Sequence, residues 1–148
     1  MVISHRHFTS LLDMATESRL RCRSLVSQAV DRLALKDYLL FEHGSASADG
    51  AGRACIDHMH LHIIPGASKA LNCFEGELSR VDESSARTPY IFVEANGEAR
   101  YYEAPGVPSQ YGRRRIWNAL GRSDWDWVVH SNHSDVRATI ARWVAWRG

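Results

Sequence analysis

The spacing of apolar residues changes along the chain, and its first part has the spacing of a helix. Between Cys22 and Leu33 apolar side chains recur every three or four positions, which places them on one helical face. Ser10 lies upstream, and Asp13 follows Ser10 by three residues, a loose form of the capping box. The pattern therefore predicts a long helix that begins near Ser10, buries one face and exposes the arginines at positions 19, 21, 23 and 32.

Two short apolar runs in the first third of the chain predict strands. Residues 1–4 have the character of a strand end, and residues 37–43 predict a strand that ends at Gly44. Residues 44–52 consist mainly of Gly, Ala and Ser, which favours a loop. Because the segments on both sides of this loop are short strands that need a common sheet, we expect the loop to lie within one domain.

Alternation returns after that loop and predicts further strands. Residues 55–65 alternate and stop at Pro65. Residues 90–103 are two β-rich runs around Asn96-Gly97, the dipeptide that type I′ hairpins prefer. Between these segments, residues 67–89 carry weak signals, and we expect them to be irregular.

The last part of the chain combines two short helices with one extended segment. Ser109 can cap a helix that runs through Leu120, and residues 125–129 favour an extended conformation. Ser134 can cap a final helix with one apolar stripe, formed by Val136, Ile140, Trp143 and Val144. The order helix, strands, hairpin, helix, helix indicates an α+β fold with an antiparallel sheet.

Length and composition narrow the class of protein. The 148 residues suit one domain, and a formal net charge of +1 provides no bulk field that would attract nucleic acid or an anionic membrane. Cys22, Cys55 and Cys73 are an odd number without Cys-x-x-Cys spacing, which argues against a disulfide framework. The chain also has no apolar run of membrane-spanning length and no secretory pattern at its start. We therefore expect a cytoplasmic protein that binds neither a membrane nor nucleic acid.

The candidate chemistry lies in the segment "HMHLHII". Alternate residues of a strand point to opposite faces, so His58, His60 and His62 line one face while Met59 and Leu61 suit a core on the other. Imidazole is a nucleophile, a proton carrier and a metal ligand near neutral pH. Three interpretations follow: a polar sheet face, a metal site that needs a further ligand, or nucleophilic catalysis at phosphorus.

The same segment resembles a known family. "HMHLHII" fits the signature His-φ-His-φ-His-φ-φ, with φ apolar, of the histidine triad (HIT) superfamily of nucleotide hydrolases and transferases. "VISHRHFTSLLDM", "FEHGS" and "CIDHMHLHIIPG" follow in the family's order, so the resemblance covers residues 2–66. "PSQYGRRRIWNALGRSDWDW" resembles the C-terminal extension of some bacterial and plant members.

The resemblance implies one HIT-like domain over residues 1–148. Residues 1–66 would form its core motif region, with a long helix after the first strand of an antiparallel sheet. Residues 67–148 would form a C-terminal hairpin and helical extension. The chain begins inside the family pattern and the family's earlier strands are missing, so we expect an incomplete nucleoside pocket, or one completed by the extension or a partner subunit. An exposed sheet edge would then favour pairing, and we expect a homodimer.

The resemblance also implies a covalent reaction in two steps. His60 would attack the α-phosphorus of a nucleotide and form a nucleotidyl-histidine, which water or another acceptor resolves. His62 would assist the proton balance of the leaving group, while His58 and His7 would orient His60. Such a step needs no metal and no cofactor, because imidazoles and backbone amides can offset the phosphate charge. Substrates would be nucleoside phosphoramidates, dinucleoside polyphosphates or similar nucleotides.

Three further residues are candidates for substrate binding. Cys55 precedes the first triad histidine by three residues, where relatives place a small polar residue near the phosphate, although a buried thiol is an equal alternative. Gln110 lies at the start of a predicted helix, an anion-binding position, although an ordinary exposed glutamine is equally consistent. His43, together with Glu42, ends a strand toward the glycine-bearing loop and would border the pocket. For the arginines at 113–115 we expect a solvated helix face.

A second class of function is consistent with the same residues. If the nucleoside pocket is incomplete, the chain would be a nucleotide-binding or metal-binding module with little catalytic activity. The two hypotheses differ in one observable: the enzyme forms a nucleotidyl adduct on His60, whereas the module binds its ligand without forming product.

Overall fold

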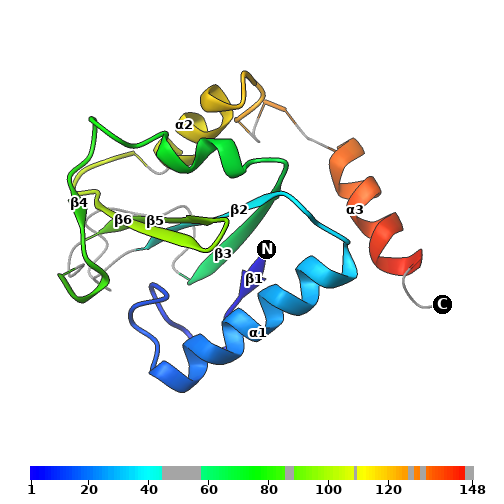
Figure 1. The fold of residues 1–148 in the computed structure, drawn as a ribbon, viewed down its shortest axis with the longest axis horizontal. Coiled ribbons are helices and arrows are strands. Elements are labelled where there is room, and N and C mark those ends of the chain that lie inside the picture. The colour runs from blue at the N-terminus through cyan, green and yellow to red at the C-terminus, as the bar shows by residue number, and fades with distance from the viewer. Residues whose placement is uncertain (45–57, 86–88, 109, 127–128, 131–132, 146–148) are drawn as a thin grey trace.

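The computed structural model describes residues 1–44, 58–85, 89–108, 110–126, 129–130 and 133–145. Within this part of the chain, six strands form one antiparallel sheet in the order β1-β3-β2-β5-β6-β4, accompanied by three α-helices (Figure 1). The strands are β1 Val2–Ile3, β2 Tyr38–Gly44, β3 His60–Pro65, β4 Arg80–Val81, β5 Tyr90–Ala95 and β6 Glu98–Glu103. The helices are α1 Thr16–Arg32, α2 Tyr111–Ala119 and α3 His133–Ala145, with 3-10 turns η1 Ser68–Asn72 and η2 Glu83–Ser85. The fold class is α+β, in agreement with the sequence pattern.

The sheet has two apolar faces, and different elements cover them. Cys22 and Val26 of α1 pack on one face together with Leu40, Met59 and Phe92. On the opposite face, α2 and η1 form a second cluster with the sheet. Its largest members are Leu39, Phe41, Phe74, Ile91, Tyr102 and Ile116. Figure 1 shows α1 on one side of the sheet, α2 and η1 on the other, and α3 beyond the sheet near the end of α1. The histidine-bearing strand β3 therefore lies in a sheet that is covered on both faces.

The strongest local prediction, the hairpin, is confirmed. β5 and β6 pair in the register Ala95↔Glu98. Asn96 and Gly97 form the connection with φ of 54° and 78°, the left-handed values that a type I′ turn requires. This hairpin supplies two of the inner strands of the sheet, because β5 pairs with β2 on its other side.

The predicted start of the first helix is wrong. The helix begins at Thr16 instead of Ser10, and its capping position is Ala15, which makes no side-chain cap. Ser10 is buried and forms a turn, in which its hydroxyl accepts the Asp13 N–H at 3.2 Å. The next two amides are held by side chains of the sheet, because the Leu11 N–H donates to Glu42 and the Leu12 N–H donates to Tyr90. These tertiary bonds hold the segment outside the helix.

The expectations for the later segments are only partly correct. Within residues 67–85 the structure contains η1, β4 and η2, so this segment is not uniformly irregular. Of the segment 125–129, for which we expected an extended conformation, residues 127 and 128 lie outside the described residues; beyond them, the Val129 and His130 N–H groups both donate to the Asp126 carbonyl. Helix α2 ends one residue before Leu120, close to the predicted end, and Ser109 lies outside the described residues.

The predicted last helix is present, and its apolar stripe is largely exposed. Val136, Ile140 and Val144 of α3 are each more than half exposed, while Trp143 is 38 % exposed. One contact ties α3 to α1: the Arg32 guanidinium lies 3.8 Å from the centre of the Trp143 ring. At the start of α3, Asp135 forms an ion pair with Arg122 at 3.4 Å, so each end of the helix has a contact with the rest of the chain. In the described part of the chain, none of the helices has the length and apolar character needed to cross a membrane.

Candidate active site

The histidine row lies at the start of β3 and divides its side chains as the alternation predicts. Met59 and Leu61 are each 1 % exposed and belong to the core under α1. His60 is buried and His62 is half-buried on the opposite face, where the His62 ring packs 5.6 Å from the Phe41 ring. The period-2 geometry of a strand therefore brings two imidazoles together, with 5.0 Å between the ring centres of His60 and His62.

A hydrogen bond to the backbone sets the orientation of His60. The Nδ1 atom of His60 lies 2.8 Å from the carbonyl oxygen of His58. Because a carbonyl oxygen can only accept, Nδ1 carries the proton, and in neutral His60 the lone pair is therefore on Nε2. The lone pair of Nε2 is therefore available as a nucleophile, and the hydrogen bond at Nδ1 fixes the plane of the ring. A partner on the second ring nitrogen sets the tautomer and the orientation of functional histidines in the same way.

His62 is kept neutral by its surroundings. Burial lowers its pKa to about 3, and the nearby His60, the N-terminus and Arg113 add smaller contributions in the same direction. At neutral pH in the substrate-free protein, His62 therefore has one N–H donor and one lone pair, and no extra proton.

His7 and His58 form a second pair of imidazoles. Their ring centres are 4.7 Å apart with the planes perpendicular. The backbone carbonyl of His58 accepts the hydrogen bond from His60 Nδ1, and this bond holds the main chain of His58 near the His60 ring. No acceptor or donor among the described residues reaches His58 Nδ1. The structure therefore places His7 and His58 side by side, and places the main chain of His58 against His60.

The remaining predicted binding residues have different positions. His43 is buried on β2, two residues beyond Phe41, which pairs with His62, so continuing this register places His43 level with His60. Gln110 is half-buried and occupies the capping position of α2 without a side-chain cap. Cys55 lies outside the described residues.

The expectation that Glu42 borders the pocket beside His43 is wrong. Glu42 is 1 % exposed and points to the other face of β2, where its two carboxyl oxygens accept the Leu11 N–H at 2.8 Å and the Tyr90 O–H at 2.5 Å. Burial raises the pKa of Glu42 to about 7, while the two hydrogen bonds oppose this rise. Successive residues of a strand face opposite sides, so Glu42 and His43 cannot both face one pocket.

A cavity of about 550 Å³ opens beside His62, between β3, α2 and α3. Its charged lining consists of Arg113, Arg122, Arg142 and Asp135. Trp117 contributes a flat aromatic wall. The expectation of a wholly solvated run at 113–115 is wrong, because Arg113 lines this cavity and Arg115 donates to the Cys73 carbonyl at 2.7 Å.

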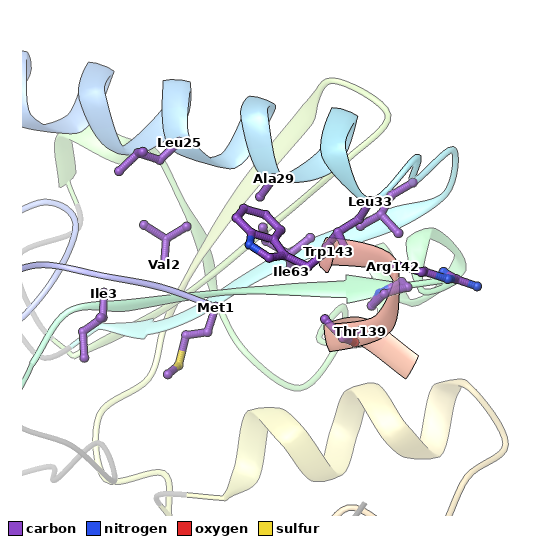
Figure 2. Close-up of a pocket in the computed structure, with 12 residues that line it drawn as sticks. Met1, Val2, Ile3, Leu25, Ala29, Leu33, Ile63, Thr139, Arg142 and Trp143 are labelled. Atoms are coloured by element: carbon purple, nitrogen blue, oxygen red, sulfur yellow. The ribbon is translucent and has the colours of Figure 1, made fainter. Parts of the chain in front are cut away.

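A second cavity, of about 480 Å³, lies on the other side of α3 (Figure 2). Figure 2 shows Leu25 and Leu33 of α1, Val2 of β1 and Trp143 of α3 around it. Arg142 is the only charged side chain among the described residues that line it. The two cavities therefore differ in character: one is apolar, and the one beside His62 is basic.

Among the described residues, no group of three or more His, Cys, Asp or Glu side chains has an arrangement that could hold a metal ion. Sequence reasoning missed the contributions of Arg142 and Trp117, because the cavity they line forms only where two helices meet β3.

Comparison with known proteins provides no assignment. The chain matches no protein-family model, and a search of curated proteins finds no relative. The case for a function therefore rests on the residues and on their geometry.

Proposed function

We propose that this chain is a nucleotidyl hydrolase or transferase of the histidine triad superfamily, acting at the α-phosphate of a nucleotide through a covalent intermediate on His60. The observation that carries the proposal is the hydrogen bond from His60 Nδ1 to the His58 carbonyl, which leaves the Nε2 lone pair for attack. The match of "HMHLHII" to the family signature and the antiparallel sheet with a long helix after the first strand support the family assignment.

The first step transfers the nucleotidyl group to the protein. Nε2 of His60 forms a bond to the α-phosphorus, and the bond from phosphorus to the leaving atom breaks with its electron pair on that atom. An amine nitrogen takes a proton from solvent as this bond breaks, whereas a phosphate leaves as the anion. Dividing one displacement at an anionic phosphorus into two steps lowers each barrier.

The second step regenerates the histidine. Water, or the hydroxyl or phosphate of another acceptor, forms a bond to phosphorus while the phosphorus–Nε2 bond breaks and its electron pair returns to Nε2. The proton of the attacking water is released to solvent. The products are a nucleoside monophosphate, or a transferred nucleotidyl group, and free His60.

His62 acts in this scheme as a neutral hydrogen-bond donor near the leaving atom. Its pKa of about 3 supports this role, because a group with that pKa carries no acidic proton at neutral pH. In this scheme the proton that an amine leaving group needs comes from solvent and not from an imidazolium at His62.

Turnover assays test the proposal. A panel of an adenosine phosphoramidate, a diadenosine polyphosphate and their guanosine counterparts is incubated with the wild type and with His60→Ala, with and without chelator. We expect release of nucleoside monophosphate from at least one compound with the wild type, no change with chelator, and a loss of at least a hundredfold in the variant, as is typical when a nucleophile is removed.

The matched control is His5→Ala, because His5 is an exposed histidine outside the row. It should retain wild-type activity. Full activity of His60→Ala would exclude a nucleotidyl-histidine at this position. Nucleotide binding without release from any compound would instead favour the binding module.

A further inference from the structure

The peptide group between His58 and Met59 is held by hydrogen bonds on both of its sides. Its carbonyl accepts the hydrogen bond from His60 Nδ1 at 2.8 Å, and its N–H donates to the Phe8 carbonyl at 2.6 Å. Because a peptide group is planar, a bond on its N–H also restrains the direction of its carbonyl. The Phe8 carbonyl therefore helps to hold the acceptor that keeps the proton of His60 on Nδ1.

The chain before Phe8 stays in contact with the same residue of β3. The register of β1 with β3 runs through Leu61 and His60. One residue further on, the Ser4 N–H donates to the Met59 carbonyl at 3.4 Å. Met59 thus has hydrogen bonds to the N-terminal segment through both of its backbone groups.

A buried pair of side chains anchors the chain after Phe8. Glu42 of β2 accepts the Leu11 N–H at 2.8 Å, and the Tyr90 hydroxyl of β5 accepts the Leu12 N–H at 3.3 Å. Tyr90 also donates to Glu42 at 2.5 Å, and both side chains are 1 % exposed. Buried hydrogen bonds of this kind are strong, and leaving one of their partners unsatisfied is costly. The pair therefore fixes the 8–12 segment to two inner strands of the sheet.

We infer that Glu42 and Tyr90 are positioning residues for His60. They hold the 8–12 segment, whose Phe8 carbonyl holds the peptide group that accepts the His60 proton donor. The pair thus maintains the tautomer of His60 in which Nε2 has the lone pair. This inference rests on the proposed function for its effect on turnover, whereas its effect on the tautomer concerns the substrate-free protein.

A measurement on the wild type tests the central link. It is the NMR coupling across the hydrogen bond between the Met59 amide nitrogen and the Phe8 carbonyl carbon. We expect a measurable coupling. Its absence overturns the inference, and it leaves the bond between His60 and the His58 carbonyl, on which the proposed function rests, unaffected.

A conservative variant tests the effect on His60. Tyr90→Phe keeps the ring and removes the hydroxyl that holds the Leu12 amide. The nitrogen chemical shifts of the His60 ring are recorded at alkaline pH, where an imidazole is neutral and its protonated and unprotonated nitrogens differ clearly. We expect Nδ1 to be the protonated nitrogen in the wild type, and the two shifts to approach each other in the variant. Glu42→Gln should give a smaller change, because its amide oxygen still accepts a hydrogen bond.

The matched control is Tyr102→Phe on β6. Tyr102 is also a buried tyrosine whose hydroxyl donates to a glutamate, Glu75, at 2.9 Å, but it belongs to the cluster on the opposite face of the sheet. Its variant should leave the Met59 coupling and the His60 shifts unchanged. Wild-type shifts in Tyr90→Phe, or the same change in Tyr102→Phe, overturn the inference.

Steady-state kinetics connect this positioning to turnover. With a compound that the wild type turns over, Tyr90→Phe should lower kcat about threefold to tenfold, the effect of one buried hydrogen bond, and leave KM within about twofold. Tyr102→Phe should match the wild type. An unchanged kcat in Tyr90→Phe overturns the inference. If the wild type turns over none of the compounds, the proposed function fails, and the coupling and the shifts still decide whether Glu42 and Tyr90 position His60.

Discussion

The buried carboxyl group of Glu42 should make the stability of the protein fall as the pH rises, and Glu42→Gln should remove this effect. Glu42 is 1 % exposed, and its pKa in the folded protein is about 7, against an ordinary value of 4.5. Between these two values the folded protein holds a proton on Glu42 that the unfolded chain has released. Because the folded state then binds more protons, the free energy of unfolding decreases with increasing pH in this interval.

The magnitude follows from the two pKa values. For a single group with these pKa values, the contribution to the free energy of unfolding falls by about 2–3 kcal/mol between pH 5 and pH 8. Gln has nearly the same shape and does not titrate, so its contribution is flat over this range. The neighbouring Tyr90 and Cys22 have pKa values raised by burial and by Glu42. Neither ionises below pH 8 in the folded protein, so neither adds to the pH dependence of the difference between wild type and variant.

Urea denaturation at several pH values measures the difference. The quantity of interest is the unfolding free energy of the wild type minus that of Glu42→Gln, which should become smaller by about 2–3 kcal/mol from pH 5 to pH 8. Taking the difference cancels the titration of all other groups. A difference that stays constant, or that grows with pH, would refute the assignment of a raised pKa to this carboxyl group.

Three further changes have defined outcomes. His62→Gln should show the opposite trend, since a folded pKa of about 3 against 6.5 makes wild-type stability rise by about 2 kcal/mol from pH 5 to pH 8; a pH-independent difference in urea denaturation would contradict this. Gly112→Ala should cost about 1–2 kcal/mol of stability, read from the urea midpoint, because the new Cβ would lie 2.6 Å from Cε2 of the buried Phe41 ring; an unchanged midpoint would show that the ring can move freely. Trp143→Ala should speed amide exchange in α3 about threefold to fivefold, because it removes the stacking of Arg32 on the indole; exchange at the wild-type rate would indicate that other contacts hold α3.

The sequence was most informative where local geometry decides the structure. Asn96-Gly97 predicts a hairpin because its residues accept positive φ, and the turn is present. The alternation around His60 predicts two faces for β3, and Met59 and Leu61 are indeed buried on one of them. Both signals depend on a few neighbouring residues, so tertiary contacts do not alter them.

The predictions that failed depend on distant residues. The helix begins at Thr16 and not at Ser10 because Glu42 and Tyr90, far away in the sequence, hold the amides of Leu11 and Leu12. The basic cavity beside the histidines forms where β3, α2 and α3 meet, and no short sequence motif predicts that these three elements come together. Sequence spacing therefore predicted that His60 and His62 lie side by side, while their surroundings required the three-dimensional structure.

The most direct test of the nucleophile is to detect the covalent intermediate. Wild type and His60→Ala are mixed with a substrate that turns over, quenched after one turnover under conditions that preserve phosphorus–nitrogen bonds, and analysed by intact mass and peptide mapping. We expect one nucleotidyl group on the wild type, located on His60, and none on the variant. An adduct on another residue, or turnover without any adduct on His60, would contradict the central claim.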